Sequence, residues 1–377
     1  MELLYKNEKP LFTINVVISL LFWLLLIIGT FGTALFFILF YFIFYIVVQS
    51  GFIAYLKGTA VKLTPQQFPD LYAQLCECCK KLEIDDIPDA YILHADGAFN
   101  AFATRFLRKH YVVLFSDIVD ALEENEGAVK FYFGHELGHI HRKHLIWGPI
   151  LAPSGLLPLI GAAYSRAREY TCDNYGFACC SSPSDAVTGM AALSAGGRRY
   201  RTMSIESYVK QADESGGFWM SFHELIADYP WLVKRMANIA SKAGVTQFQP
   251  PERHPLAWFL ALFVPRTGGA AGGVSVITGI AIIGIIAVVA IPNFIAYRDK
   301  AMLVPIQNEL LSLKAAQENF YQYNKRYAQS LEELGFTPTY QDASFEILGA
   351  DSTCFGAKGR SINSELEVYI DCNGLRE

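Results

Sequence analysis

Residues 134–144 read GHELGHIHRKH and hold four of the eight histidines of this 377-residue chain. His135 and His139 are four positions apart, and Glu136 follows the first of them. On a helix these two imidazoles lie on one face and can bind one ion, while Glu136 reaches a water molecule on that ion. This HExxH pattern predicts a zinc site, since the metal lowers the pKa of bound water from about 16 toward 7. Glu136 would act as general base: it would take the proton of that water as the water attacks a peptide carbonyl, and would then pass the proton to the leaving amine.

The other two histidines of this stretch are expected to be surface residues. With a turn of about 100° per residue, His144 faces away from His135, and His141 lies well off the ligand face. The motif by itself is a hypothesis, because chance gives one HExxH in roughly a hundred chains of this length.

A catalytic zinc also needs a third protein ligand and one open position. The segment SRAREYTCDNYG, residues 165–176, offers Glu169 and Asp173 four positions apart on an expected helix. A solvated acidic helix face gives the same pattern, so the residues alone leave both interpretations open. A structural zinc site fits less well, because such sites use Cys or His in all four positions and Cys172 lies one step off the Glu169 face.

Long uncharged runs predict membrane spans. The segments from Pro10 to Leu56 and from Thr267 to Tyr297 contain no Asp, Glu, Lys, Arg or His. Both exceed the roughly 20 residues that cross a bilayer. We expect a hairpin of two spans, about 11–29 and 33–55, and a third span at about 274–297. A cleaved signal peptide fits the first run poorly, because a signal peptide has one short apolar core, whereas this run contains two long spans.

Two shorter apolar segments are expected to remain at the membrane surface. A single crossing by residues 145–164 would separate the two histidines from Glu169, and three prolines disfavour a straight helix there. This segment is interpreted as a dipping or membrane-facing loop near the site. Residues 255–265 would be about 16 Å long as a helix, which is too short to cross, and are interpreted as interfacial.

Cysteine usage predicts the sides of the membrane. Six of the eight cysteines lie between the hairpin and the third span, and the adjacent Cys78 and Cys79 are expected to be free thiols, as in a reducing cytosol. Cys354 and Cys372 lie alone in the tail and can pair in an oxidising space. We therefore expect a bacterial inner-membrane protein with a cytoplasmic peptidase domain and an extracytoplasmic C-terminal domain. The net charge of -5 and the absence of a basic stripe argue against a nucleic-acid partner.

The sequence FGHELGHI followed by SRAREYTCD resembles the HtpX-like and CAAX prenyl protease family of membrane zinc metallopeptidases. The sequence NAFA at 100–103, before YVVLF, and the two N-terminal spans are also similar, so the likeness covers about residues 1–245. It implies one zinc ion per chain, with Glu136 as general base and three metal ligands: His135, His139 and Glu169.

The same resemblance implies supporting roles for other residues. Asp173 would orient a ligand histidine, and Asn100 and Ala101 would lie on an edge strand that pairs with an extended substrate. The family usually has a His-Pro followed by an arginine, but the stretch here is DYPWLVKRM, with Tyr229 at the histidine position and Arg235 matching the arginine.

The departure at Tyr229 leaves the oxyanion donor open. A tyrosine hydroxyl can donate to an oxyanion, and His223 in SFHEL is another possible donor. Reduced activity is a further interpretation, and a buried structural aromatic is the competing role for Tyr229.

The last span and the tail, about 274–377, resemble type IV pilins and pseudopilins. Aligning on the apolar helix puts Ala270 and Ala271 at the processing junction and Ser275 at the position of the pilin glutamate. This implies a retained anchor that is not cleaved and has no charge to drive fibre assembly. A generic span with an unrelated tail is the competing interpretation.

Together these features predict an α+β chain and an integral-membrane zinc metalloendopeptidase that cuts membrane-associated or misfolded proteins. Its partners would be the substrate, the lipid bilayer and, through the C-terminal domain, pilus or secretion components. The alternative is a non-catalytic pilus or secretion component with a vestigial protease fold. The expected domains are a transmembrane hairpin (1–56), a mainly helical zincin-type peptidase domain with a small sheet (57–250), an interfacial segment and linker (251–273), a transmembrane helix (274–297) and a pilin-like α+β domain (298–377).

Overall fold

The computed structural model describes residues 2–94, 100–264, 272–364 and 366–376. The chain divides into two compact units, Met1–Gly284 and Ile285–Glu377, and helix α14 (Gly272–Asn324) crosses the division. Helices combine with two four-stranded sheets, which agrees with an α+β chain. The finer domain boundaries expected from the sequence stay predictions.

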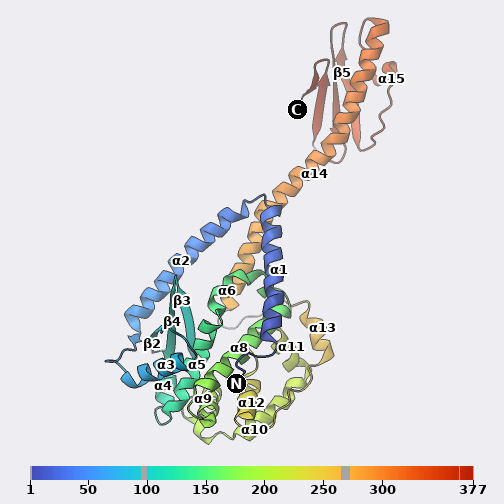
Figure 1. The fold of residues 1–377 in the computed structure, drawn as a ribbon. Coiled ribbons are helices and arrows are strands. Elements are labelled where there is room, and N and C mark those ends of the chain that lie inside the picture. Colours follow the sequence, from blue (N-terminus) through green and yellow to red (C-terminus); the bar gives the residue numbers. More distant parts are fainter. Residues whose placement is uncertain (1, 95–99, 265–271, 365, 377) are drawn as a thin grey trace. The chain divides into compact units, whose positions relative to one another are not determined.

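Helices α1 (Glu8–Gly29) and α2 (Ala34–Thr59) form the N-terminal hairpin (Figure 1). Phe31 and Gly32 have φ angles of 50° and 82°, which reverse the chain between the helices. The mean hydropathy of the two helices reaches 2.7 and 2.2, and both are long enough to cross a membrane. Most of their large apolar side chains are exposed, as a lipid-facing surface requires. These helices therefore agree with the two predicted spans.

The first sheet has the strand order β1-β2-β4-β3. Strand β4 runs parallel to β2 and antiparallel to β3, so β3 is an edge strand. Alternate side chains of β4 face opposite layers: Val113 packs with Leu56 of α2, and Val112 packs in the main core. The strands are β1 (Val61–Lys62), β2 (Asp89–Leu93), β3 (Ala101–Phe106) and β4 (Lys109–Phe115).

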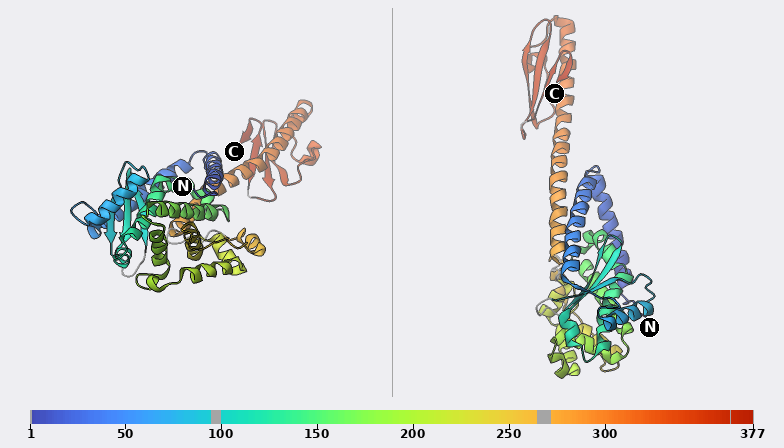
Figure 2. Two further views of the ribbon diagram at one scale, coloured as in Figure 1. Left: turned by 60° about the horizontal axis from the view of Figure 1, so that its bottom comes forward. Right: turned by 90° about the vertical axis from the view of Figure 1, so that its left-hand side faces the viewer.

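Helix α5 (Glu126–His141) lies at the centre of the first unit and packs along α8 (Ile160–Cys179) (Figure 2). Two glycines allow this close approach. A Cβ on Gly134 would lie 2.7 Å from the carbonyl oxygen of Tyr175, and one on Gly176 would lie 2.6 Å from that of Phe131. Both distances are shorter than van der Waals contact, so larger residues would push the two helices apart.

The remaining helices of the first unit surround this pair. Helix α3 begins at Pro69, directly after Phe68, which adopts a left-handed conformation with φ of 61°. The bounds are α3 (Pro69–Lys81), α4 (Ser116–Ala121), α6 (His144–Ile150), α7 (Ala152–Gly155), α9 (Pro183–Ala195), η1 (Arg199–Thr202), α10 (Ile205–Lys210), η2 (Gln211–Gly216), α11 (Phe218–Ile226), α12 (Leu232–Lys242) and α13 (Pro255–Ala261).

The segment expected to be a loop, residues 145–164, is mainly helical. It contains α6, α7 and the start of α8, with breaks near its prolines. Helix α7 packs against the membrane hairpin, where the Ser19 hydroxyl of α1 donates a hydrogen bond of 2.8 Å to Ser154. The expectation of a loop is therefore wrong.

The second unit packs the last turns of α14 on an antiparallel sheet. Ile306, Leu310 and Leu313 of α14 are buried against this sheet. A disulfide joins Cys354 to Cys372. The sheet comprises β5 (Ala343–Ala350), β6 (Phe355–Ser361), β7 (Glu367–Asp371) and β8 (Gly374–Arg376), and α15 (Leu331–Leu334) precedes it.

The pilin-like features before this unit are only partly described. The expected third span lies within α14, and Ala270 and Ala271 lie outside the described residues, as does the side chain of Ser275. The third span and the uncleaved junction therefore stay predictions.

Candidate metal centre

The two HExxH histidines and the distant glutamate come together between α5 and α8. His135 Nε2 lies 3.5 Å from Glu169 Oε2, and His139 Nε2 lies 3.6 Å from Glu169 Oε1. Ligand atoms on a tetrahedral zinc ion with bonds of about 2.0–2.1 Å lie about 3.4 Å apart. Each histidine lies near that distance from a different oxygen of Glu169. Glu169 is 4% exposed, so water does not screen it from the imidazoles, and the three side chains lie close enough together to hold one zinc ion.

Asp173 and Arg235 hold the far side of His135. Asp173 Oδ1 lies 3.0 Å from His135 Nδ1, and Arg235 donates to both carboxylate oxygens of Asp173 at 2.9 and 2.6 Å. Burial alone would raise the pKa of Asp173, but Arg235 and His135 outweigh it and hold the pKa at about 2. The ionised Asp173 fixes the ring of His135 and leaves Nε2 directed toward Glu169.

Glu136 is buried beside the edge strand of the sheet. Burial raises its pKa to about 7, although the charge of His135 and a hydrogen bond from the Ala103 backbone in β3 lower it. Ala101 is also buried on β3, whereas Asn100 is exposed just before it. The side chain expected to act as base thus lies next to the strand expected to pair with substrate.

Tyr229 is 45% exposed, so the interpretation as a buried structural aromatic is wrong. The negative charge of Glu169 is the largest cause that raises its pKa to about 12, followed by burial and Glu136. The Tyr229 hydroxyl therefore lies within the field of the two site carboxylates. His223 is exposed, and its described ring contacts are with Trp219 and Phe222 of its own helix.

His144 is buried, with 3% exposure, and the expectation that it lies on the surface is wrong. Its Nδ1 lies 3.1 Å from Nδ1 of His139, and its Nε2 lies 3.3 Å from Oε1 of Glu8. The angular argument failed because α5 ends at His141 and Lys143 turns the chain with a φ of 58°. Burial lowers the pKa of His144 to about 4, so it is neutral at neutral pH.

Little in the sequence indicates these two contacts. Glu8 is the acidic residue nearest the start of the first apolar run, and that placement is the one signal it carried. His141 is exposed, as expected, and its Nδ1 lies 2.8 Å from the Tyr175 hydroxyl.

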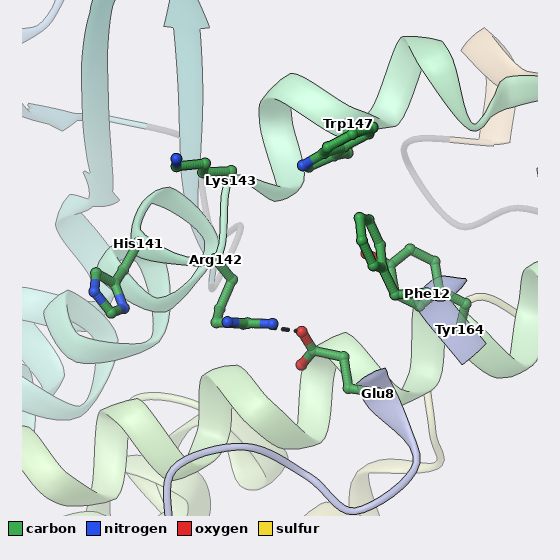
Figure 3. Close-up of a pocket in the computed structure, with 7 residues that line it drawn as sticks. All are labelled: Glu8, Phe12, His141, Arg142, Lys143, Trp147 and Tyr164. Carbon is green, nitrogen blue, oxygen red and sulfur yellow. Dashed lines mark hydrogen bonds and ion pairs between the residues drawn. The ribbon is translucent and has the colours of Figure 1, made fainter. Parts of the chain in front are cut away.

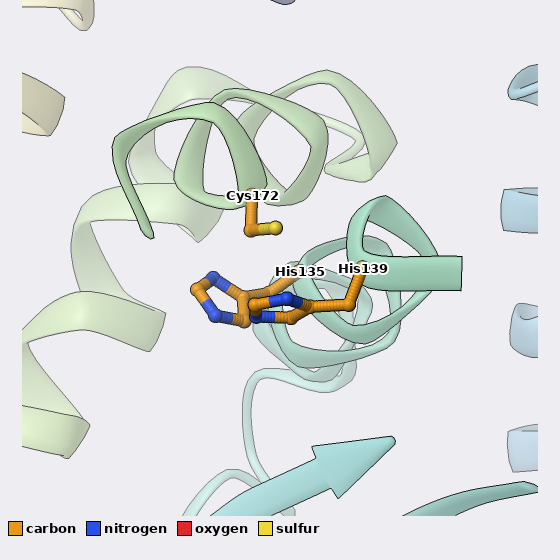
Figure 4. Close-up of side chains that lie close together, drawn as sticks. All are labelled: His135, His139 and Cys172. Carbon is orange, nitrogen blue, oxygen red and sulfur yellow. The ribbon is translucent and has the colours of Figure 1, made fainter. Parts of the chain in front are cut away.

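Cys172 is a second candidate for the third ligand position. Its thiol points toward the rings of His135 and His139 (Figure 4), and the three residues offer ligand atoms within 4.8 Å of one another. Burial and the Glu169 carboxylate raise the pKa of Cys172 well above the usual value. Burial would also raise the pKa of Glu169, but the nearby histidines and Arg235 hold it at about 2. An ionised carboxylate binds zinc without first losing a proton, which favours Glu169.

Comparison with known proteins supports the same chemistry. Residues 65–152 match the family model of peptidase family M48. The match includes both HExxH histidines but ends before Glu169, and it supports a zinc metallopeptidase without resolving an HtpX-like subgroup. Together with the two apolar helices, the M48 match indicates a membrane-associated metalloprotease.

A shorter similarity links the chain to a pilin. It is 39% identical over 59 residues to the type IV major pilin protein PilA of Myxococcus xanthus (strain DK1622). The similarity covers 16% of this chain, which spans only 27% of the length of that pilin. It hints at a pilin-like segment. No solved structure matches the chain significantly.

Proposed function

We propose that this protein is an integral-membrane zinc metalloendopeptidase. The supporting observation is that the Glu169 carboxylate lies 3.5 and 3.6 Å from Nε2 of His135 and His139. These three residues would hold one zinc ion. When bound, the ion would supply Lewis acidity, which lowers the pKa of water toward about 7.

Residues of the chain carry the proton transfers. Glu136 accepts a proton from the attacking water and gives it to the leaving amine. Tyr229 donates a hydrogen bond to the oxyanion that develops on the scissile carbonyl, since its raised pKa of about 12 keeps its hydroxyl protonated. Arg235 touches Asp173 and Glu169 and keeps both carboxylates in place.

The substrate is an extended polypeptide that adds to the free edge of β3. The hydrogen bond from the Ala103 backbone to Glu136 supports this role, because a strand paired with β3 would run past the base. Membrane-associated or misfolded proteins are the favoured substrates. The hairpin lies in the bilayer, and α13 presents exposed apolar side chains at Leu256, Trp258 and Phe259.

Glu136→Gln tests the proposal, because it keeps the size of the side chain and removes the base. We expect cleavage of casein, or self-cleavage, to vanish in the full-length protein while zinc binding remains. Glu124→Gln is the matched control, since the Glu124 side chain is 73% exposed and its ion pair among the described residues is with Arg201. Equal cleavage by the Glu136→Gln protein and wild type would contradict the proposal.

The similarity to PilA favours a second candidate, a non-catalytic component of a pilus or secretion apparatus. The same Glu136→Gln variant separates the two functions, because the cellular phenotype of a scaffold would survive the substitution.

For the membrane orientation we propose a cytoplasmic peptidase domain and an extracytoplasmic C-terminal domain. The free thiol of the half-exposed Cys76 and the Cys354–Cys372 disulfide support it. Labelling of Cys76 from outside intact cells would contradict this orientation.

A further inference from the structure

Behind His139, two side chains connect the HExxH helix to the membrane hairpin. His139 Nδ1 lies 3.1 Å from His144 Nδ1, and His144 Nε2 lies 3.3 Å from Glu8 Oε1. Glu8 is the first residue of α1 and is 1% exposed. A buried carboxylate costs several kcal/mol unless it is paired, so Glu8 requires partners at this position.

One arrangement of protons satisfies every contact in this series. If His139 binds metal through Nε2, its Nδ1 carries the proton and donates to His144 Nδ1. His144 then carries its own proton on Nε2, which donates to the carboxylate of Glu8. The opposite tautomer of His144 would set two N–H groups against each other at 3.1 Å.

Glu8 is held firmly enough to orient other groups. The backbone N–H of Tyr5 donates to the Thr171 hydroxyl at 2.9 Å, and the Asn174 amide donates to the Leu3 carbonyl at 2.9 Å. Thr171 and Asn174 lie on α8, the helix that carries Glu169. The start of α1 is therefore fixed to the wall of the metal centre.

Arg142 provides a different kind of contact to Glu8. Its Nε donates to Glu8 Oε1 at 3.0 Å, and the Arg142 side chain is 34% exposed. The two residues meet at a cavity of about 260 Å³, also lined by Phe12, Trp147 and Tyr164 (Figure 3). Solvent screens this ion pair more than the buried contact with His144. The two contacts can therefore be tested separately.

We propose that Glu8 and His144 are positioning residues of the metal centre, in which membrane helix α1 supplies the carboxylate that orients His139. Asp173 has the same relation to His135. This inference rests on the proposed zinc site and adds a dependence of that site on the membrane hairpin. Removing such a support lowers metal affinity by about 10- to 100-fold in other proteins.

The experiment measures zinc affinity of the full-length protein in nanodiscs by competition with a chelator. Glu8→Ala and His144→Ala should each weaken zinc binding about 10- to 100-fold. The double variant should lose little more than the weaker-binding single variant, because the two residues act as one unit. Glu8→Gln should retain more affinity than Glu8→Ala, since its amide oxygen still accepts from His144.

Two controls separate positioning from folding. Arg142→Ala removes the ion pair with Glu8 but keeps the contacts from Glu8 through His144 to His139. Asn15→Ala changes a buried polar residue of α1 whose described side-chain hydrogen bond lies within the helix, at 2.7 Å to the Leu11 carbonyl. Both should bind zinc nearly as wild type does.

A second readout is the visible absorption spectrum of the Co²⁺-substituted protein. Glu8→Ala and His144→Ala should alter the spectrum, and the two control variants should not. Unchanged affinity and spectrum in Glu8→Ala and His144→Ala would overturn this inference and leave the zinc site standing. A wild-type protein that binds no zinc would overturn both.

Discussion

The two histidines of the HExxH pattern lie one helical turn apart, yet different regions of the molecule support them. His135 is backed by Asp173 and Arg235, which lie on helices of the peptidase region. His139 is backed by His144 and, through it, by Glu8 of the membrane hairpin. The difference is that one side of the candidate centre is supported within the peptidase region, whereas the other is contacted from the N-terminal apolar hairpin.

The two sides also differ in charge. Burial alone would lower the pKa of His135, but Asp173 and Glu169 reverse this and raise it to about 10. Burial lowers the pKa of His139 well below its usual value, and no carboxylate touches its Nδ1 among the contacts described. In the metal-free protein, His135 therefore carries a second proton and His139 does not.

The largest effect is expected where the His135 side is broken. Asp173→Ala leaves the buried charge of Arg235 without its main partner, so the free energy of unfolding should fall by about 3–5 kcal/mol. Thermal unfolding of the metal-free protein in detergent measures this loss. Asp173→Leu combined with Arg235→Met should recover much of it, because that pair removes both charges. A melting temperature of Asp173→Ala equal to that of wild type would contradict the role of this ion pair.

A substitution at the expected oxyanion donor should lower the rate of cleavage without changing zinc binding. Tyr229→Phe should lower kcat by about 10²-fold, as loss of an oxyanion donor does, and leave zinc affinity unchanged. His223→Ala is the control, because the described contacts of His223 are with aromatic neighbours on α11. Peptide cleavage and zinc titration on the same samples measure both quantities. A normal kcat in Tyr229→Phe would remove Tyr229 from the mechanism.

The contact between α5 and α8 holds both histidines near Glu169, and a substitution at one glycine can weaken it. Gly134→Ala would place a Cβ 2.7 Å from the Tyr175 carbonyl oxygen and move Glu169 away from the histidines. We expect a loss of about 1–3 kcal/mol in unfolding free energy, together with weaker zinc binding. Gly148→Ala on α6 is the matched control, since nothing lies within 4 Å of its added Cβ. Equal zinc affinity in the two variants would refute this packing argument.

The charge difference predicts a dependence of zinc binding on pH. The raised pKa of His135 means that its extra proton stabilises the metal-free fold below pH 6.5, and this stabilisation is lost as pH rises through about 10. Zinc must displace that proton, so uptake near pH 8 should release about one proton per ion and affinity should rise with pH. Calorimetry in buffers of different ionisation enthalpy counts the protons.

Asp173→Asn provides the comparison for this pH dependence. It removes the charge that raises the pKa of His135, and proton release near pH 8 should therefore decrease. The same release in wild type and variant would show that the proton comes from another group.

Much of the His135 side could be predicted from the sequence, and little of the His139 side could. Spacings of four positions place His135 with His139, and Glu169 with Asp173, because each pair lies on one helix. The His144 contact depends on where α5 ends, and a single left-handed residue, Lys143, decides that. Helix ends are less predictable than helix interiors, since they depend on one or two residues.

The tertiary contacts of Glu8 could not be predicted from the sequence either. Glu8 looks like an ordinary charged residue before a membrane helix, and only packing of α1 on α8 brings it near the site. The hairpin helices were accessible, because long apolar runs dictate them locally. The helical α6 and α7 were missed, since their prolines suggested a loop.

X-ray absorption at the zinc edge of the wild-type protein tests the central claim most directly. Glu169 and Cys172 both lie close enough to complete the site with His135 and His139. The account predicts only nitrogen and oxygen neighbours at about 2.0–2.2 Å. A sulfur neighbour at about 2.3 Å would identify Cys172 as the ligand and contradict the assignment of Glu169.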